Sequence, residues 1–136
     1  MEREGYVSLW IGIIDSDLEL SKYLELGYTD DGDYIPSQFL TDFNIDLDEF
    51  DEEFTERNFA KNLTDSIIEL TKGCSYEDVV LEKFQDLYSD TCKEKLNSAF
   101  LLYNFQFDEN IKQIKTDKYY FRFVGSIKYL NWSNLP

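Results

Sequence analysis

Long apolar runs near the two ends of the chain predict the strands of a sheet. Residues 6–14 are almost continuously apolar and rich in β-branched and aromatic side chains, which predicts a central strand buried on both faces. Gly12 inside this run indicates a bulge or a close approach by another segment. Residues 99–107 and 119–130 predict two further strands, which we expect to pair as a C-terminal antiparallel β-hairpin across a long polar connection.

Between these strands, apolar side chains recur at helical spacing. The pattern predicts helices over residues 17–26, 37–43, 62–72 and 75–88. Residues 44–59 fit either a strand or an irregular loop held by aromatic side chains. Helices between a first strand and a terminal strand pair are typical of an α+β fold, with the helices packed on a mixed or antiparallel sheet. The whole chain of 136 residues has the size of one domain, so we expect a single domain.

The segment from Asp30 to Glu56 is strongly acidic and at the same time rich in apolar side chains. Between Lys22 and Arg57 there is no basic residue. Disordered acidic tails contain few aromatic residues, so this composition indicates folded structure that holds carboxylates toward water. A face kept only for solubility is the alternative, but such surfaces usually mix both signs of charge. We expect the partner-binding residues to be Asp30, Asp31, Asp33, Tyr34, Asp46, Asp48, Glu49, Phe50, Asp51, Glu52 and Glu53.

The charge of the chain is unevenly distributed. The net charge is −15, with 24 acidic and 6 basic residues in 1–90 but 4 acidic and 7 basic residues in 91–136. Direct binding to nucleic acid or to an anionic membrane is therefore not expected, and the natural partner is a basic molecule. No apolar run reaches the length of a membrane span and no secretory signal is visible, so we expect a cytoplasmic protein. The oligomeric state is left open.

The residue inventory excludes most catalytic chemistry. The chain has no histidine, which removes Ser-His and Cys-His nucleophiles and histidine-based zinc sites. No phosphate-binding glycine motif occurs, and Cys74 and Cys92 are expected as free thiols. We therefore expect no enzymatic activity, metal or cofactor. Three alternatives remain. The first is a calcium site at Asp30, Asp31 and Asp33, although the closing glutamate of an EF-hand loop is missing. The others are a carboxylate-dependent enzyme domain and an acidic adaptor for another basic protein.

Five short motifs in succession resemble one protein family. They are VSLWIG at 7–12, DGDYIPS at 31–37, DFNID at 42–46, SY at 75–76 and FVGSI at 123–127. In this order they resemble the immunity protein 22 family of bacterial polymorphic-toxin systems. The resemblance implies a cytoplasmic protein that binds and neutralises a cognate toxin.

The charge adds a mechanism to this resemblance. Toxins that cut nucleic acid carry basic clefts, so a fixed acidic surface would compete with phosphate there and would accelerate association. We therefore expect the toxin to be a basic nuclease. Specificity is expected from aromatic anchors interleaved with the acids, in particular Tyr28, Tyr34 and Phe50.

Overall fold

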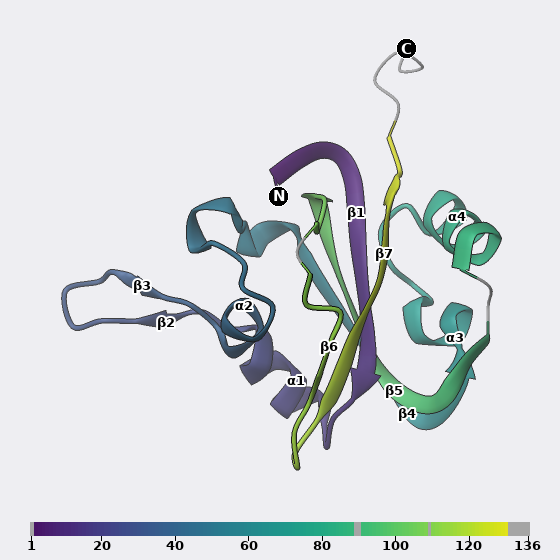
Figure 1. The fold of residues 1–136 in the computed structure, drawn as a ribbon, viewed down its shortest axis with the longest axis horizontal. Helices are drawn as coiled ribbons and strands as arrows, with labels where there is room; N and C mark the ends of the chain where they lie inside the picture. Colours follow the sequence, from purple (N-terminus) through teal and green to yellow (C-terminus); the bar gives the residue numbers. More distant parts are fainter. Residues whose placement is uncertain (1, 89–90, 109, 131–136) are drawn as a thin grey trace.

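The computed structural model describes residues 2–88, 91–108 and 110–130. In this part of the chain, the main element is an antiparallel five-stranded sheet in the order β4-β5-β1-β7-β6 (Figure 1). The middle strand is the first one in the sequence, which confirms the predicted central position of the N-terminal strand. The strands are β1 (Glu2–Ile13), β4 (Thr55–Ser66), β5 (Thr91–Phe105), β6 (Gln113–Lys115) and β7 (Tyr120–Lys128).

Strand β1 is buried on both faces, as its continuous apolar run predicts. Val7, Leu9 and Ile11 belong to the core on one side of the sheet, and Trp10 belongs to the core on the other side. The close approach predicted at Gly12 is confirmed, because a Cβ atom there would lie 2.0 Å from the carbonyl oxygen of Tyr120 in β7. Only glycine allows the two backbones to pair at this distance.

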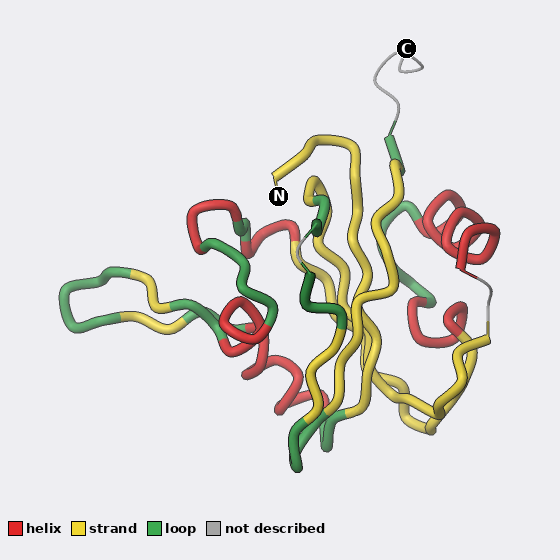
Figure 2. Tube along the Cα trace, viewed as in Figure 1, coloured by secondary structure: helices red, strands yellow, loops and turns green. Residues whose placement is uncertain are grey.

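Helices cover both faces of the sheet (Figure 2), and within residues 2–88, 91–108 and 110–130 each face has two α-helices. One side carries α1 (Asp17–Leu24) and α2 (Gln38–Asp42), and the other carries α3 (Ile67–Thr71) and α4 (Glu77–Tyr88). The first two begin where the sequence supplies a cap: the Ser16 hydroxyl accepts from the Glu19 N–H, and the Ser37 hydroxyl accepts from the Leu40 N–H. The predicted α+β fold is confirmed.

The core beneath α1 and α2 is largely aromatic. Trp10 stacks on Phe100 with ring centroids 5.5 Å apart and meets Phe39 edge to face at 5.0 Å. Tyr23 of α1 stacks on Phe121 of β7 at 4.7 Å. Such pairs add about 0.5–1.5 kcal/mol each beyond the area they bury, so they fix the two helices firmly on the sheet.

The sequence-based expectation of a helix over residues 62–72 is wrong for its first half. β4 runs through this region to Ser66, and only Ile67–Thr71 is helical. β4 pairs antiparallel with β5 from Thr55 to Ser66, with an irregularity between Phe59 and Thr64. This pairing with a distant strand outweighs the local helical pattern. Leu63, an apolar residue of that pattern, is 52% exposed.

The closing hairpin is present, but its first strand is not the one expected. Strands β5 and β7 lie on opposite sides of β1 and each pairs with β1. The hairpin partner of β7 is β6, a short strand inside the region read as a polar connection. Residues 99–107 and 119–130 are therefore neighbours of the same strand and not of each other, because a central apolar strand offers two edges.

Candidate partner-binding surface

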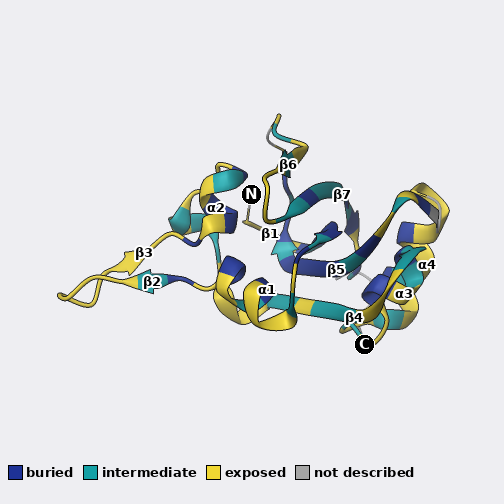
Figure 3. Ribbon diagram, turned by 90° about the horizontal axis from the view of Figure 1, so that it is seen from below, coloured by how far each residue is buried: buried dark blue, intermediate teal, exposed yellow. Residues whose placement is uncertain are grey.

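The first part of the acidic segment is a narrow β-ribbon that projects from the body of the protein (Figures 1 and 3). Its strands, β2 (Gly27–Tyr28) and β3 (Tyr34–Ile35), pair with each other and with no further strand of the described residues. The chain reverses at residues 29–33, where the Gly32 N–H donates to the Thr29 carbonyl at 3.0 Å and the Thr29 N–H donates to the Asp33 carbonyl at 2.8 Å. Gly32 has φ +88°, which suits the position after a type I turn. Asp30 and Asp31 therefore occupy an exposed tip.

Two tyrosines form a pair on this ribbon. Tyr28 and Tyr34 are cross-strand neighbours with ring centroids 5.1 Å apart, and they are 60% and 56% exposed. Loss of solvation, followed by the nearby Tyr34 and then the Glu52 carboxylate, raises the pKa of the Tyr28 hydroxyl. The base of the ribbon thus lies within electrostatic reach of the second part of the acidic segment.

The second part of the acidic segment contains two 3-10 turns. They lie within residues 44–59, for which the sequence is compatible with either a strand or an irregular loop. They are η1 (Leu47–Glu49) and η2 (Glu52–Phe54), and β4 follows directly. Two carboxylates cap them: Asp46 accepts from the Asp48 N–H at 2.9 Å, and Asp51 accepts from the Glu53 N–H at 2.9 Å. These two aspartates therefore shape the backbone as well as adding charge.

Apolar side chains fasten the two turns to the body, which leaves the acids on the outside. Phe43 and Ile45 are buried, and Leu47 and Phe50 pack half-buried against the core around Trp10. Of the predicted binding residues in this part, Glu49 and Phe50 are half-buried, and the exposed ones are Asp46, Asp48, Asp51, Glu52 and Glu53.

Two carboxylates of the acidic segment turn inward and serve the fold. Asp42 accepts hydrogen bonds from the Tyr119 hydroxyl at 2.7 Å, from the Tyr23 hydroxyl at 2.9 Å and from the Gln38 amide at 2.8 Å. Burial, together with this carboxylate, raises the pKa of both tyrosines. Glu56 accepts from the Ser75 N–H at 2.9 Å and from its hydroxyl at 2.8 Å. Both carboxylates are thus hydrogen-bonded within the protein.

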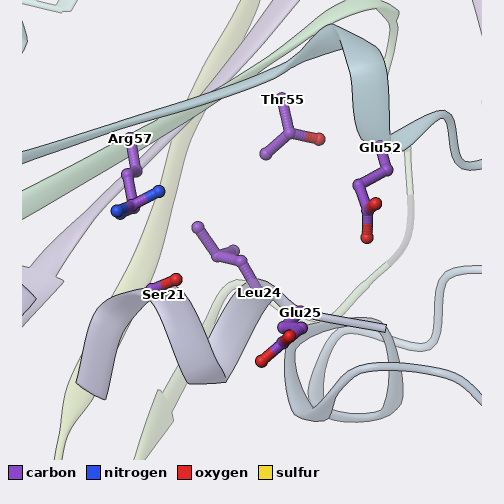
Figure 4. A pocket seen from close by; sticks show the side chains of 6 residues that line it. All are labelled: Ser21, Leu24, Glu25, Glu52, Thr55 and Arg57. Atoms are coloured by element: carbon purple, nitrogen blue, oxygen red, sulfur yellow. The ribbon is translucent and has the colours of Figure 1, made fainter. Parts of the chain in front are cut away.

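The fold places carboxylates from other parts of the chain beside the acidic segment. Glu2 and Glu4 of β1 line a pocket of about 160 Å³ together with Glu49 and Asp51. Glu25, at the end of α1, and Glu52 line a second pocket of about 240 Å³, with Arg57 at its far side (Figure 4). No sequence signal indicates these groupings, since Glu2 and Glu49 meet only through the position of β1 in the sheet.

Three ion pairs of the described residues hold basic side chains of the body. Arg57 pairs with Asp17 at 3.1 Å, Lys22 with Glu19 at 3.7 Å and Arg122 with Glu94 at 3.9 Å. These cations are therefore directed at acids outside the predicted binding set. No three ligand-type side chains in the described ranges converge as a metal site would require, so the geometry gives the calcium alternative at the ribbon tip no support.

The family model described as Immunity protein 22 matches residues 7–130. The chain belongs to the Immunity protein 22 family. No curated protein and no solved structure matches it. Membership of this family points to the neutralisation of a toxin. The match spans the ribbon, both 3-10 turns and β4, whereas Glu2 and Glu4 lie outside it.

For this Immunity protein 22 family member, the structure separates the predicted binding residues into two groups. Asp30, Asp31, Asp33 and Tyr34 lie on the ribbon, and the remaining seven lie on or beside η1 and η2. None of the helices in the described part of the chain is both long enough and apolar enough for a membrane span.

Proposed function

We propose that this Immunity protein 22 family member neutralises a basic toxin, a nuclease, by placing its acidic surface over the cleft in which the toxin binds nucleic acid. It acts by binding and not by catalysis, in the cytoplasm, with the chain forming one binding unit. The observation that carries the proposal is the set of exposed carboxylates on and beside η1 and η2. They flank Leu47 and Phe50, which pack half-buried against the core.

Rigid placement of these carboxylates is what makes them an effective substitute for phosphate. A nuclease cleft offers cationic groups that are already arranged for a chain of negative charges. Fixed carboxylates meet them without the entropy cost of ordering a flexible acidic tail. The opposite fields also raise the association rate, by about 10 to 10³-fold at low salt.

The pockets beside the two turns supply recognition of individual side chains. In the pocket between β1 and the 3-10 turns, the carboxylates of Glu2, Glu4 and Asp51 stand beside the apolar side chains of Phe54 and Phe105. A lysine or arginine packs its apolar stem on such a surface and its charge against the acids. Contacts of this kind can distinguish one basic toxin from another, whereas attraction between net charges cannot.

A charge-reversal pair tests this proposal. Asp48→Lys with Glu52→Lys changes two exposed acids while keeping the caps Asp46 and Asp51. Binding to an inactive variant of the cognate toxin is followed by stopped-flow kinetics at several salt concentrations. We expect the association rate at low salt to fall at least about tenfold and its salt dependence to become flatter.

The matched control is Glu82→Lys with Asp86→Lys, which makes the same change of charge on exposed positions of α4 on the other side of the sheet. An equal loss of rate in both variants would show that only net charge matters, and the proposed surface would be wrong. A second measurement addresses the cleft. Duplex DNA should compete with the immunity protein for the toxin, and undiminished DNA binding by the toxin–immunity complex would refute occlusion.

A further inference from the structure

The β2–β3 ribbon exposes apolar side chains without contributing to either core. Its two strands have two residues each, and in the described part of the chain they pair with no other strand. Tyr28 and Tyr34 are 60% and 56% exposed, and Ile35 is 45% exposed. Figure 3 shows the ribbon extending well beyond the helices and the sheet.

Stability explains only part of this exposure, since the cross-strand tyrosine pair contributes about 0.2–1 kcal/mol to the ribbon. An isolated two-stranded ribbon is marginal in water, and the hydrophobic effect rewards only side chains that are removed from water. A serine at either tyrosine position would leave the turn and its glycine unchanged. Exposed aromatic residues on a protruding element are instead typical of the anchors that supply most of the energy of an interface.

Both faces of the ribbon carry apolar side chains. The cross-strand pair Tyr28–Tyr34 occupies one face. Ile35, opposite Gly27, points to the other face, because neighbouring residues of a strand alternate. A flat partner would cover only one of these faces, whereas a cleft covers both.

We propose that the β2–β3 ribbon inserts into the basic cleft of the toxin, with Tyr28 and Tyr34 as the anchor pair. The proposal rests on the proposed function and specifies how the partner is held. The occupant is identified by charge: the tip presents Asp30, Asp31 and Asp33, exposed, in a stretch of sequence that has no basic residue. A cleft lined by lysine and arginine complements this tip, and cationic side chains also stack favourably on tyrosine rings.

The experiment compares affinities for the inactive toxin by calorimetry. We expect Tyr28→Ser with Tyr34→Ser to weaken binding at least about 30-fold, the equivalent of about 2 kcal/mol. The control, Leu63→Ser with Leu87→Ser, removes two apolar side chains that are 52% and 65% exposed on β4 and α4. It should stay within about twofold of the unaltered protein, as contacts outside an anchor do. Thermal unfolding of each variant confirms that the fold is retained.

A chemical footprint gives a second readout that does not depend on the variants. Tyrosine nitration should modify Tyr28, Tyr34 and Tyr76 in the free protein, since Tyr76 on the other side of the sheet is 53% exposed. In the complex, Tyr28 and Tyr34 should be protected and Tyr76 should remain reactive. Equal reactivity of all three in the complex would overturn insertion of the ribbon.

The outcomes separate this inference from the function on which it rests. If the unaltered protein binds the toxin and the Asp48 and Glu52 variant binds slowly, but the tyrosine variant keeps full affinity, the ribbon inference is wrong and the proposed function stands. If the unaltered protein does not bind the toxin at all, both are wrong.

Discussion

Replacing Asp42 with alanine should destabilise the protein strongly, although Asp42 belongs to a segment whose other acids mostly face water. Its carboxylate holds three elements together: Gln38 and Asp42 lie on α2, Tyr23 on α1 and Tyr119 immediately before β7. The Tyr23 hydroxyl is the critical partner, since this residue is only 4% exposed. Without Asp42, a buried hydroxyl loses its acceptor.

The magnitude follows from these contacts. A hydrogen bond to a charged group contributes about 1.5–3 kcal/mol, and the two tyrosine bonds at the lower end give about 3 kcal/mol. The Gln38 bond is exposed and lies within one helix, so it adds little. Since small domains are stable by about 5–15 kcal/mol in total, this is a large fraction.

Urea unfolding measures the loss. With a denaturant slope of about 2 kcal/mol/M, Asp42→Ala should lower the midpoint by about 1.5 M without changing the slope. Asp48→Ala, an exposed acid of the same segment, should change the free energy of unfolding by no more than about 0.5 kcal/mol. In a double-mutant cycle, Tyr119→Phe should cost much less in the Asp42→Ala background than alone. Equal midpoints for the Asp42 and Asp48 variants would refute the reasoning.

Two further predictions concern stability. Gly12→Ala should lower the free energy of unfolding, measured by thermal unfolding, by at least about 2 kcal/mol, because the new Cβ would meet backbone of β7 at 2.0 Å. Gly32→Ala should lower it by about 1 kcal/mol, because φ is +88° there but the space around the residue is open. Burial raises the pKa of three tyrosines in the folded state, so above about pH 10 the unfolded chain loses protons first. Stability should then fall by up to about 1.4 kcal/mol per pH unit for each of the buried Tyr23 and Tyr103, and by less for the half-buried Tyr119, where water screens the charge. A urea midpoint that stays constant between about pH 9 and pH 11 would contradict this effect of Tyr23, Tyr103 and Tyr119.

The candidate surface was only partly predictable. Acids interleaved with aromatic residues indicate a folded acidic segment. The alternation of polar and apolar residues there agrees with the exposed Asp48 and the buried Ile45. The same composition does not distinguish Asp48, which is exposed, from Asp42, which binds two tyrosines from distant elements. That difference depends on where α1 and β7 lie, so no local pattern contains it.

For the fold, the sequence alone determined whatever depends on neighbouring residues. The continuous apolar run at 6–14 requires burial on both faces and hence a central strand. The residues Asp30-Asp31-Gly32 suit the tight turn of the β2–β3 ribbon. The tertiary structure decided which strands pair, turned residues 55–66 into an edge strand, and brought Glu2 and Glu4 beside Glu49. Periodicity reports how one segment is buried, whereas pairing and clustering depend on the energies of contacts between segments far apart in the chain.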